Sequence, residues 1–211
     1  MKKITSILFS VIFATGILSG CGSSANNAST STSGTKSDLL SSSYADMMKS
    51  GKYFMHYKTK ITVGSQTIYA DTTMATDGKS TSINGVTGEV KTHIIMRDSK
   101  VYMINDADKS YLKMDVPATG NVQSDTGTNK IDTNGLAYIG KGKANLNGKE
   151  LDYEEYKTDS GTMRYYFDGS KLYGIGVKAG ETEVIMEIIE MSNKITEDMF
   201  VIPTGYTEKS I

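Results

Sequence analysis

From Lys52 onward, apolar and polar residues alternate along the chain. In the segment 52–63, the odd positions carry Tyr53, Met55 and Tyr57, while the even positions carry lysines and His56. This period of two predicts a strand with one buried face and one solvated face. Further segments of this kind are expected at about 66–76, 79–84, 90–97, 100–105, 109–115, 136–146, 149–158, 161–168, 171–178 and 182–191.

Short turn signals separate these segments, among them Gly64-Ser65, Asp77-Gly78 and Asn147-Gly148. Such turns join antiparallel neighbours. No long helical pattern lies between the strands, which argues against a βαβ arrangement. The sequence therefore predicts a mainly β (α+β) fold, a large antiparallel meander of about eleven strands.

A short helix is expected before the first strand. Ser37 or Asp38 would cap it and Gly51 would end it. Its apolar side chains recur every three or four residues and should pack on the sheet; they are Leu40, Tyr44, Met47 and Met48.

The C-terminus predicts a turn of helix near 196–200 and then an extended segment. Phe200, Ile202 and Tyr206 are expected to pack onto the sheet.

The segment Val116–Gly135 breaks the alternation, because it is long, polar and without periodicity. A loop of this length is unusual in a compact domain. It is interpreted either as a flap over an opening or as a crossing between two halves of the sheet.

The N-terminus has the order of features expected of an export signal. Lys2 and Lys3 precede an apolar run from Ile4 to Ile17, which is short for a transmembrane helix and is followed by Leu18-Ser19-Gly20-Cys21. The segment resembles a bacterial lipoprotein signal with its lipobox. That resemblance implies that Cys21 is diacylated on sulfur and becomes the mature N-terminus. The alternative is an ordinary signal peptide with a coincidental cysteine.

After Cys21, Gly22–Ser37 consists almost entirely of small polar residues and is expected to be a flexible tether. The predicted organisation is a signal peptide at 1–20, lipidated Cys21 with its tether at 21–37, and one domain at 38–211. No cofactor is expected beyond the covalent diacylglycerol, with or without an N-acyl chain, on Cys21. Two or three acyl chains would hold the protein on a membrane persistently.

Composition removes several classes of function. The 211 residues include 1 Cys and 2 His, and the formal net charge is −1. A disulfide framework and a multi-cysteine metal site are excluded, and a nucleic-acid partner is not expected. The sequence contains no G-x-S-x-G elbow, H-E-x-x-H, P-loop or dinucleotide fingerprint. We therefore expect no catalytic residues, no metal site and no enzymatic activity.

Three weaker candidates for chemistry have simpler explanations. His56 and His93 could form a pair only if their strands were neighbours, and solvent-facing histidines are the simpler interpretation. The acidic stretch 105–108 lacks the glycine and glutamate of a calcium loop, so a hairpin turn is expected. Asp152 and Glu154 share one strand face, which we expect to be solvated.

Tyrosines are concentrated in the second half of the chain, where they either pack on the sheet or form a recognition surface. This cluster comprises Tyr153, Tyr156, Tyr165, Tyr166 and Tyr173.

Methionine is the other enriched residue, and eleven of the twelve methionines follow Cys21. Methionine is flexible and polarizable, so it suits both a core and a pliable apolar cavity. The candidates for a ligand cavity are Met55, Tyr57, Ile61, Ile68, Met74, Ile94, Met96, Met103, Met114, Met186 and Ile188.

The order of elements resembles the lipoprotein-carrier superfamily, which includes LolA/LolB and LppX/LprG. The resemblance rests on an N-terminal helix, two runs of strands with a break between them, and the ending Met199-Phe200-x-Ile202-Pro203-x-Gly205-Tyr206. It implies an antiparallel half-barrel around an apolar cavity, and the binding of lipids or lipid-modified proteins. The chain departs from the family in the polar segment Val116–Gly135, where the carriers have helices that help to plug the half-barrel.

The function expected is that of a non-catalytic, extracytoplasmic lipoprotein, held on the cell membrane by its anchor. It would bind a lipid, a lipidated protein or another apolar ligand, as a monomer. The alternative is an envelope interaction or sensor module with a filled core, and an enzyme acting on envelope material is a third hypothesis.

Overall fold

The computed structural model describes residues 39–115, 136–158 and 160–210. The expected signal peptide, Cys21, the tether and the segment Val116–Gly135 lie outside these residues. The described elements are the helix α2 (Ser41–Lys49), the 3-10 helix η3 (Glu197–Phe200) and the strands β1 (Lys52–Val63), β2 (Gln66–Asp77), β3 (Thr81–Thr87), β4 (Val90–Arg97), β5 (Lys100–Asn105), β6 (Ser110–Asp115), β7 (Ala137–Leu146), β8 (Lys149–Lys157), β9 (Thr162–Asp168), β10 (Lys171–Ala179), β11 (Thr182–Ser192) and β12 (Thr207–Lys209).

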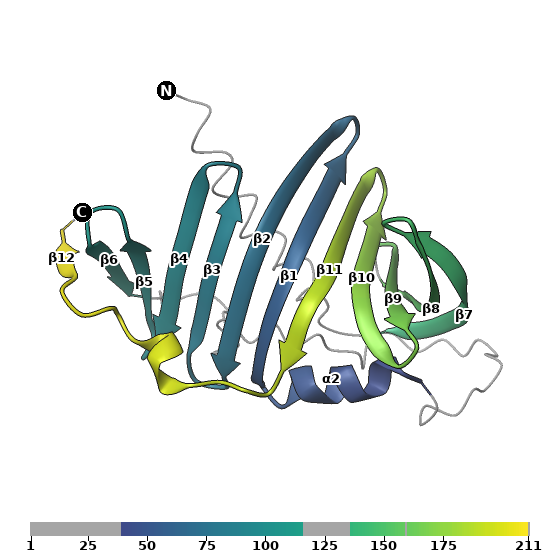
Figure 1. Cartoon of the computed structure of the whole chain (residues 1–211), viewed down its shortest axis with the longest axis horizontal. Helices are drawn as coiled ribbons and strands as arrows, with labels where there is room; N and C mark the ends of the chain where they lie inside the picture. The colour runs from purple at the N-terminus through teal and green to yellow at the C-terminus, as the bar shows by residue number, and fades with distance from the viewer. Residues whose placement is uncertain (1–38, 116–135, 159, 211) are drawn as a thin grey trace.

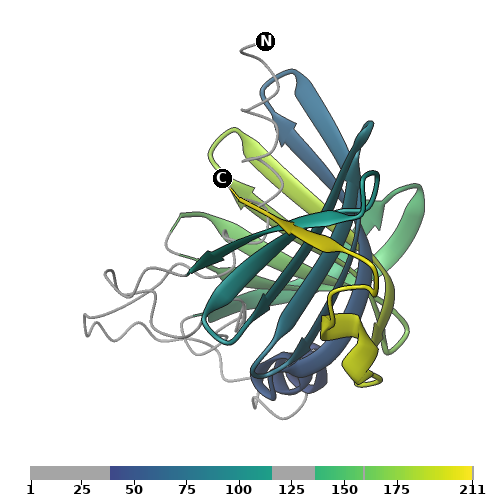
Figure 2. The ribbon, with the colours of Figure 1, turned by 90° about the vertical axis from the view of Figure 1, so that its left-hand side faces the viewer.

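All twelve strands form one sheet in the order β12-β6-β5-β4-β3-β2-β1-β11-β10-β9-β8-β7. The strands β1–β6 form one meander of hairpins, and β7–β11 form a second. The two meanders are joined where β1 pairs antiparallel with β11 (Figure 1). The sheet is curved and open, and α2 lies across the end of its central strands (Figures 1 and 2). The predicted half-barrel of antiparallel strands is confirmed.

The pairing register divides the sheet into two faces. We call the face that carries Met55 the inner face, because α2 packs on it, and the opposite face the outer face. The largest core cluster lies on the inner face, where Met48 of α2 meets side chains from β1, β2 and β8–β11. The long strands therefore bury one side, as their alternation predicts.

The start of α2 is held by a distant carboxylate. The expected caps Ser37 and Asp38 lie outside the described residues, and Leu40, at the N-cap position, makes no side-chain cap bond. Instead, the Glu154 carboxylate of β8 accepts hydrogen bonds from the backbone N–H groups of Leu40 at 2.8 Å and Ser41 at 3.1 Å. The expectation that Glu154 lies on a solvated face is wrong: its side chain is buried, because it satisfies the free N–H groups of the helix.

Two further contacts fix α2 on the sheet. Ser41 Oγ and Tyr156 Oη lie 2.6 Å apart, and Tyr44 Oη accepts the backbone N–H of Leu172 at 2.9 Å. Met48 is almost fully buried below the helix. The helix is thus attached to β8 and β10 by hydrogen bonds and to the central strands by apolar packing. Among the described residues, no helix is both long and apolar enough to cross a membrane.

The C-terminal segment returns across the outer face. The predicted turn of helix is η3, Phe200 is buried, and Ile202 and Tyr206 pack against Ile95, Tyr102 and Ile104. The chain then adds β12 parallel to β6, which the sequence did not predict. Three polar residues carry no alternation that could indicate a strand.

Removal of the Glu154 carboxylate should loosen α2. Glu154→Ala leaves two helix N–H groups without their acceptor, so we expect the free energy of unfolding to fall by about 1–3 kcal/mol. Denaturant unfolding, followed by circular dichroism, measures it. Asp152→Ala is the matched control, because Asp152 lies two residues away on the same strand and is exposed. Equal effects of the two substitutions would contradict this role of Glu154.

Candidate functional site

Side chains on the inner face lie in rows that run across the strands. One row passes from β1 to β6 through Met55, Met74, Ile83, Ile94, Met103 and Leu112. The row beside it contains Tyr53, Thr76, Thr81, Met96, Val101 and Met114. These pairs follow from antiparallel registry, in which directly opposed residues share a face.

The register brings all eleven candidate cavity residues onto this one face. Ile61 lies opposite Ile68, and Tyr57 lies opposite Ile188. Met186 lies opposite Thr59, in the next inner-face pair along β1. Whether these residues contact a ligand stays a prediction.

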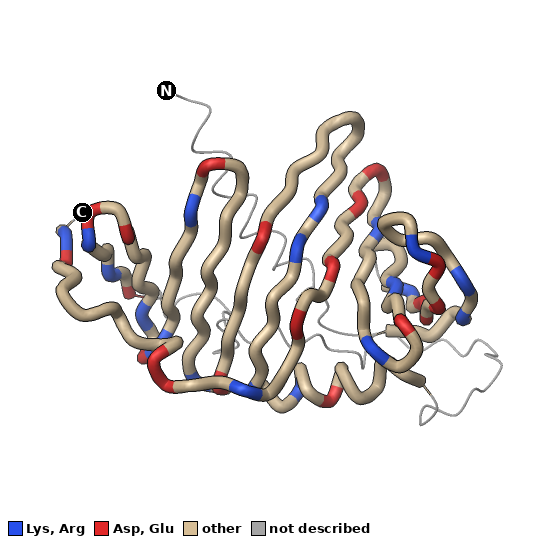
Figure 3. The backbone as a smooth tube through the Cα atoms, in the orientation of Figure 1, with Lys and Arg blue, Asp and Glu red and all other residues tan. Residues whose placement is uncertain are grey.

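Charged residues are absent from most of this face. Figure 3 shows Lys, Arg, Asp and Glu spread over the strands. On β1–β6 and β9–β11, the register places each of these residues, and both histidines, on the outer face; Lys58, for example, lies opposite Asp71 and Glu187. Charged inner-face positions among the described strands occur on β7 and β8, where Lys141 pairs with Glu154 and Lys143 with Asp152, and at the opposite edge on β12, where Lys209 lies opposite Leu112.

The inner face is not equally covered along the sheet. Met55, Met74 and Met186 are buried, whereas Met96, Met103 and Met114 are only half-buried. An apolar side chain that keeps part of its surface accessible retains free energy that a bound apolar group could gain, about 25 cal/mol per Å². The apolar surface available to a ligand therefore lies over β4–β6.

Two tyrosines lie in the buried part of the inner face. Burial, with a smaller contribution from Tyr57, raises the pKa of Tyr53 to about 12. Burial also raises the pKa of Tyr57 to about 12, although a hydrogen bond with the Thr72 hydroxyl opposes the shift. Both phenols are therefore neutral hydrogen-bonding groups at physiological pH.

A cavity of about 460 Å³ opens between the start of α2 and β7–β9. Its apolar walls are Leu39, Leu40 and Phe167, and Lys141 and Lys143 lie at its β7 side. This end of the half-barrel therefore combines apolar and charged lining, unlike the inner face of β1–β6.

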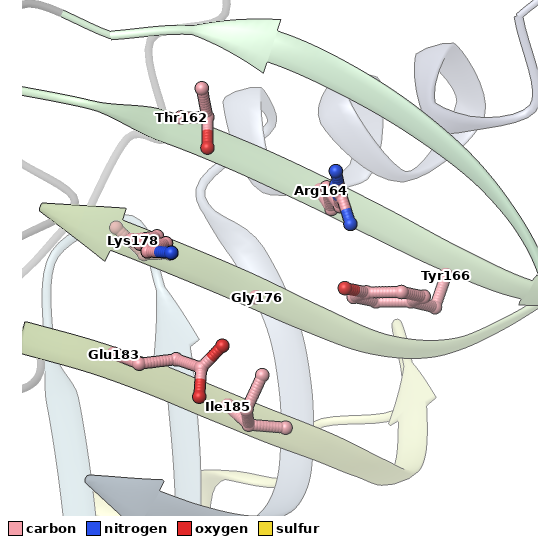
Figure 4. Close-up of a pocket in the computed structure, with 8 residues that line it drawn as sticks. Thr162, Arg164, Tyr166, Gly176, Lys178, Glu183 and Ile185 are labelled. Carbon is pink, nitrogen blue, oxygen red and sulfur yellow. The ribbon is translucent and has the colours of Figure 1, made fainter. Parts of the chain in front are cut away.

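The outer face carries a smaller groove of about 170 Å³ over β9–β11, drawn in Figure 4. Gly176 lies between Arg164 and Ile185, and Tyr166 lies at one end of the groove. The Arg164 guanidinium is already engaged, because its Nε donates to Glu155 at 2.8 Å and its centre lies 4.4 Å from the Tyr153 ring centroid. The groove is a shallow polar depression.

The structure shows where the two histidines and the acidic stretch 105–108 lie. His56 on β1 and His93 on β4 are separated by β2 and β3, so they form no pair. His56 Nε2 lies 2.7 Å from Asp71 Oδ1, and His93 Nδ1 lies 3.4 Å from Asp106 Oδ1. In the acidic stretch 105–108, Asn105 is the last residue of β5, and residues 106–109 form the turn to β6. Within the described residues, no three His, Cys, Asp or Glu side chains are grouped to hold a metal ion.

Most of the tyrosine cluster is structural. Tyr156, Tyr165 and Tyr166 are buried, and Tyr153 and Tyr173 pack against Leu146 and Leu151 on the outer face. Of the two interpretations of this cluster, packing on the sheet is the one that the structure favours.

No protein-family model matches the chain, and a search of curated proteins found no match. Several solved structures have a similar arrangement of strands. A conserved protein of Thermus thermophilus is 8% identical, with 79% of this chain and 94% of that chain covered, at a TM-score of 0.45. A LolA superfamily protein of Nitrosomonas europaea is 10% identical, with 75% and 94% covered, at a TM-score of 0.41.

The MucB chain in the MucA/MucB complex of Pseudomonas aeruginosa is also similar. It is 6% identical, with 75% of this chain and 58% of that chain covered, at a TM-score of 0.41. At identities this low, the function has to be argued from the residues of the chain itself.

The buried tyrosines should make the protein sensitive to alkali. Each of these tyrosines has a pKa of about 12 in the folded state, against an ordinary value of 10. Its contribution to the free energy of unfolding is therefore fully present below pH 10 and is lost as the pH rises toward 12. Each such tyrosine should lower the free energy of unfolding by about 1.4 kcal/mol per pH unit in that window. Denaturant unfolding at several alkaline pH values measures the slope.

Tyr57→Phe should reduce this slope, whereas Tyr69→Phe should not, because Tyr69 is 64% exposed. An unchanged slope in Tyr57→Phe would show that Tyr57 titrates normally in the folded protein.

Proposed function

We propose that the chain is a lipid-anchored, extracytoplasmic protein that binds an acyl lipid, or the lipid group of a modified protein, on the inner face of its half-barrel. It acts as a monomer and without catalysis. The observation that carries this proposal is the inner face itself, which is apolar, free of charged side chains on β1–β6 and β9–β11, and only half-buried at Met96, Met103 and Met114.

The residue types on this surface suit acyl chains. Methionine side chains have several rotatable bonds and a polarizable sulfur, so they adapt to chains of different length and curvature. The inner face of β1–β6 and β9–β11 carries no charged side chain, so it imposes no charge requirement on the ligand. Over β1–β6 and β9–β11, it also offers no carboxylate, imidazole or amine that could act as a general acid or base, which supports a binding role.

The alternative is an interaction module whose half-barrel is filled by its own residues. The two functions differ in one observable, the presence of exchangeable lipid in the purified protein.

A bound lipid should be detectable by native mass spectrometry of the full chain in a mild detergent. Met103→Glu places a carboxylate among the apolar rows, so lipid occupancy should fall at least about tenfold. The matched control is Val86→Glu, because Val86 is 43% exposed and lies on the outer face of β3. If neither the unmodified chain nor the control carries lipid, the interaction module is favoured.

The anchor has its own test. We expect the intact mass of the mature protein to lack residues 1–20 and to include a diacylglycerol on Cys21. Cys21→Ala should abolish incorporation of labelled palmitate. Labelling that persists in Cys21→Ala would show that the lipid is attached to another residue, and would contradict the proposed anchor at Cys21.

A further inference from the structure

A cavity of about 410 Å³ lies where β5 separates from β4. The ladder between these two strands ends at the pair of Ile94 and Met103, although β4 begins at Val90 and extends past β5 (Figure 1). The cavity occupies this end of the ladder. Among its lining residues are Lys91 and His93 of β4, Met103 of β5, Asp106 of the following turn, Leu112 of β6 and Lys209 of β12.

The lining comes from both faces of the sheet. Met103 and Leu112 belong to the inner-face row that contains Met55, and both are half-buried. Lys91 and His93 belong to the outer face of β4. A molecule in the cavity can therefore contact apolar inner-face side chains and polar outer-face groups at the same time. The cavity also adjoins the apolar surface over β4–β6, where the proposed function places the acyl chains.

Both carboxylates near the cavity already have partners. Asp106 Oδ1 accepts a hydrogen bond from Tyr206 Oη at 2.8 Å and lies 3.4 Å from His93 Nδ1. Asp108, in the turn between β5 and β6, forms an ion pair with Lys209. The positive charge of Lys209 is therefore compensated within the protein.

Lys91 is the charged group of this lining that lacks such a partner. Its side chain is exposed, and it makes no hydrogen bond or ion pair with any residue that the structure describes. An ammonium beside apolar walls attracts an anion more strongly than one surrounded by water, because less solvent screens the pair. The cavity thus offers an uncompensated positive charge next to the apolar surface.

We propose that this cavity binds the anionic head group of an acyl lipid whose chains lie along the methionine rows, and that Lys91 pairs with the anion. This inference rests on the proposed function and names its ligand class. A phosphate group is such an anion, and its oxygens accept charge-assisted hydrogen bonds from an ammonium. The inner-face lysines of β7 lie at the other end of the sheet and cannot serve a lipid held over β4–β6.

Three ligands separate the head group from the acyl chains. The full chain, in a mild uncharged detergent, is titrated by calorimetry with dioctanoyl phosphatidate, dioctanoylglycerol and inorganic phosphate. The phosphatidate should bind at least about tenfold more tightly than dioctanoylglycerol, as expected for a hydrogen bond to a charged group. This advantage should shrink as salt is added, because salt screens accessible charges. Inorganic phosphate, which has no acyl chain, should bind most weakly.

Substitution of Lys91 locates the effect. Lys91→Met removes the ammonium at similar length and should bring phosphatidate affinity down to that of dioctanoylglycerol, whose own affinity stays unchanged. Lys91→Arg should retain most of the preference. Lys60→Met is the matched control, because Lys60 is an exposed outer-face lysine of β1 and lines none of the three cavities described here.

A second variant should strengthen binding. Asp108→Asn removes the carboxylate that neutralises Lys209, so a second free ammonium would line the same cavity. The affinity for the phosphatidate should rise, whereas the affinity for dioctanoylglycerol should not change.

The outcomes separate the head-group site from the proposed function. Equal binding of phosphatidate and dioctanoylglycerol, a preference that survives in Lys91→Met, or an equal loss in Lys60→Met would overturn the head-group site while leaving lipid binding intact. Inorganic phosphate that binds as tightly as the phosphatidate would show a site for free anions instead. Absence of binding by both lipids would overturn the proposed function, and the head-group site with it.

Discussion

The structure depends on the strict alternation of side chains along antiparallel strands. From β1 through β6, neighbouring strands pair without a shift in register. The charged side chains of these strands therefore all lie on the outer face, and the methionines of β1, β2, β4, β5 and β6 lie on the inner face. A slip of one residue would exchange the faces and bring lysines among the methionines. The two halves are joined by β1 and β11, where a bulge near His56 preserves the inner-face positions of Met186 and Ile188.

Much of this arrangement could be predicted from the sequence. Alternation is a local signal, so the strands and the side of each methionine follow from the spacing of residues. The eleven cavity candidates were chosen by residue type, yet they share a face, because local alternation and hairpin turns together determine the registry. The strand β12 was missed, because three polar residues in a parallel pair carry no local signal.

The features that were not predicted depend on residues far apart in the chain. Glu154 acts on α2 across 114 residues, and its burial could not be inferred from a strand in which acidic residues and tyrosines alternate.

The edge strands of the sheet are protected from other copies of the chain by different means. At one edge, β12 occupies the hydrogen-bonding groups of β6 over three residues. At the other edge, β7 carries Lys141 and Lys143, which a second copy paired edge to edge would bring toward its own lysines. Over the part of the chain that the structure describes, both edges therefore discourage the edge-to-edge pairing of copies from which a fibre would start.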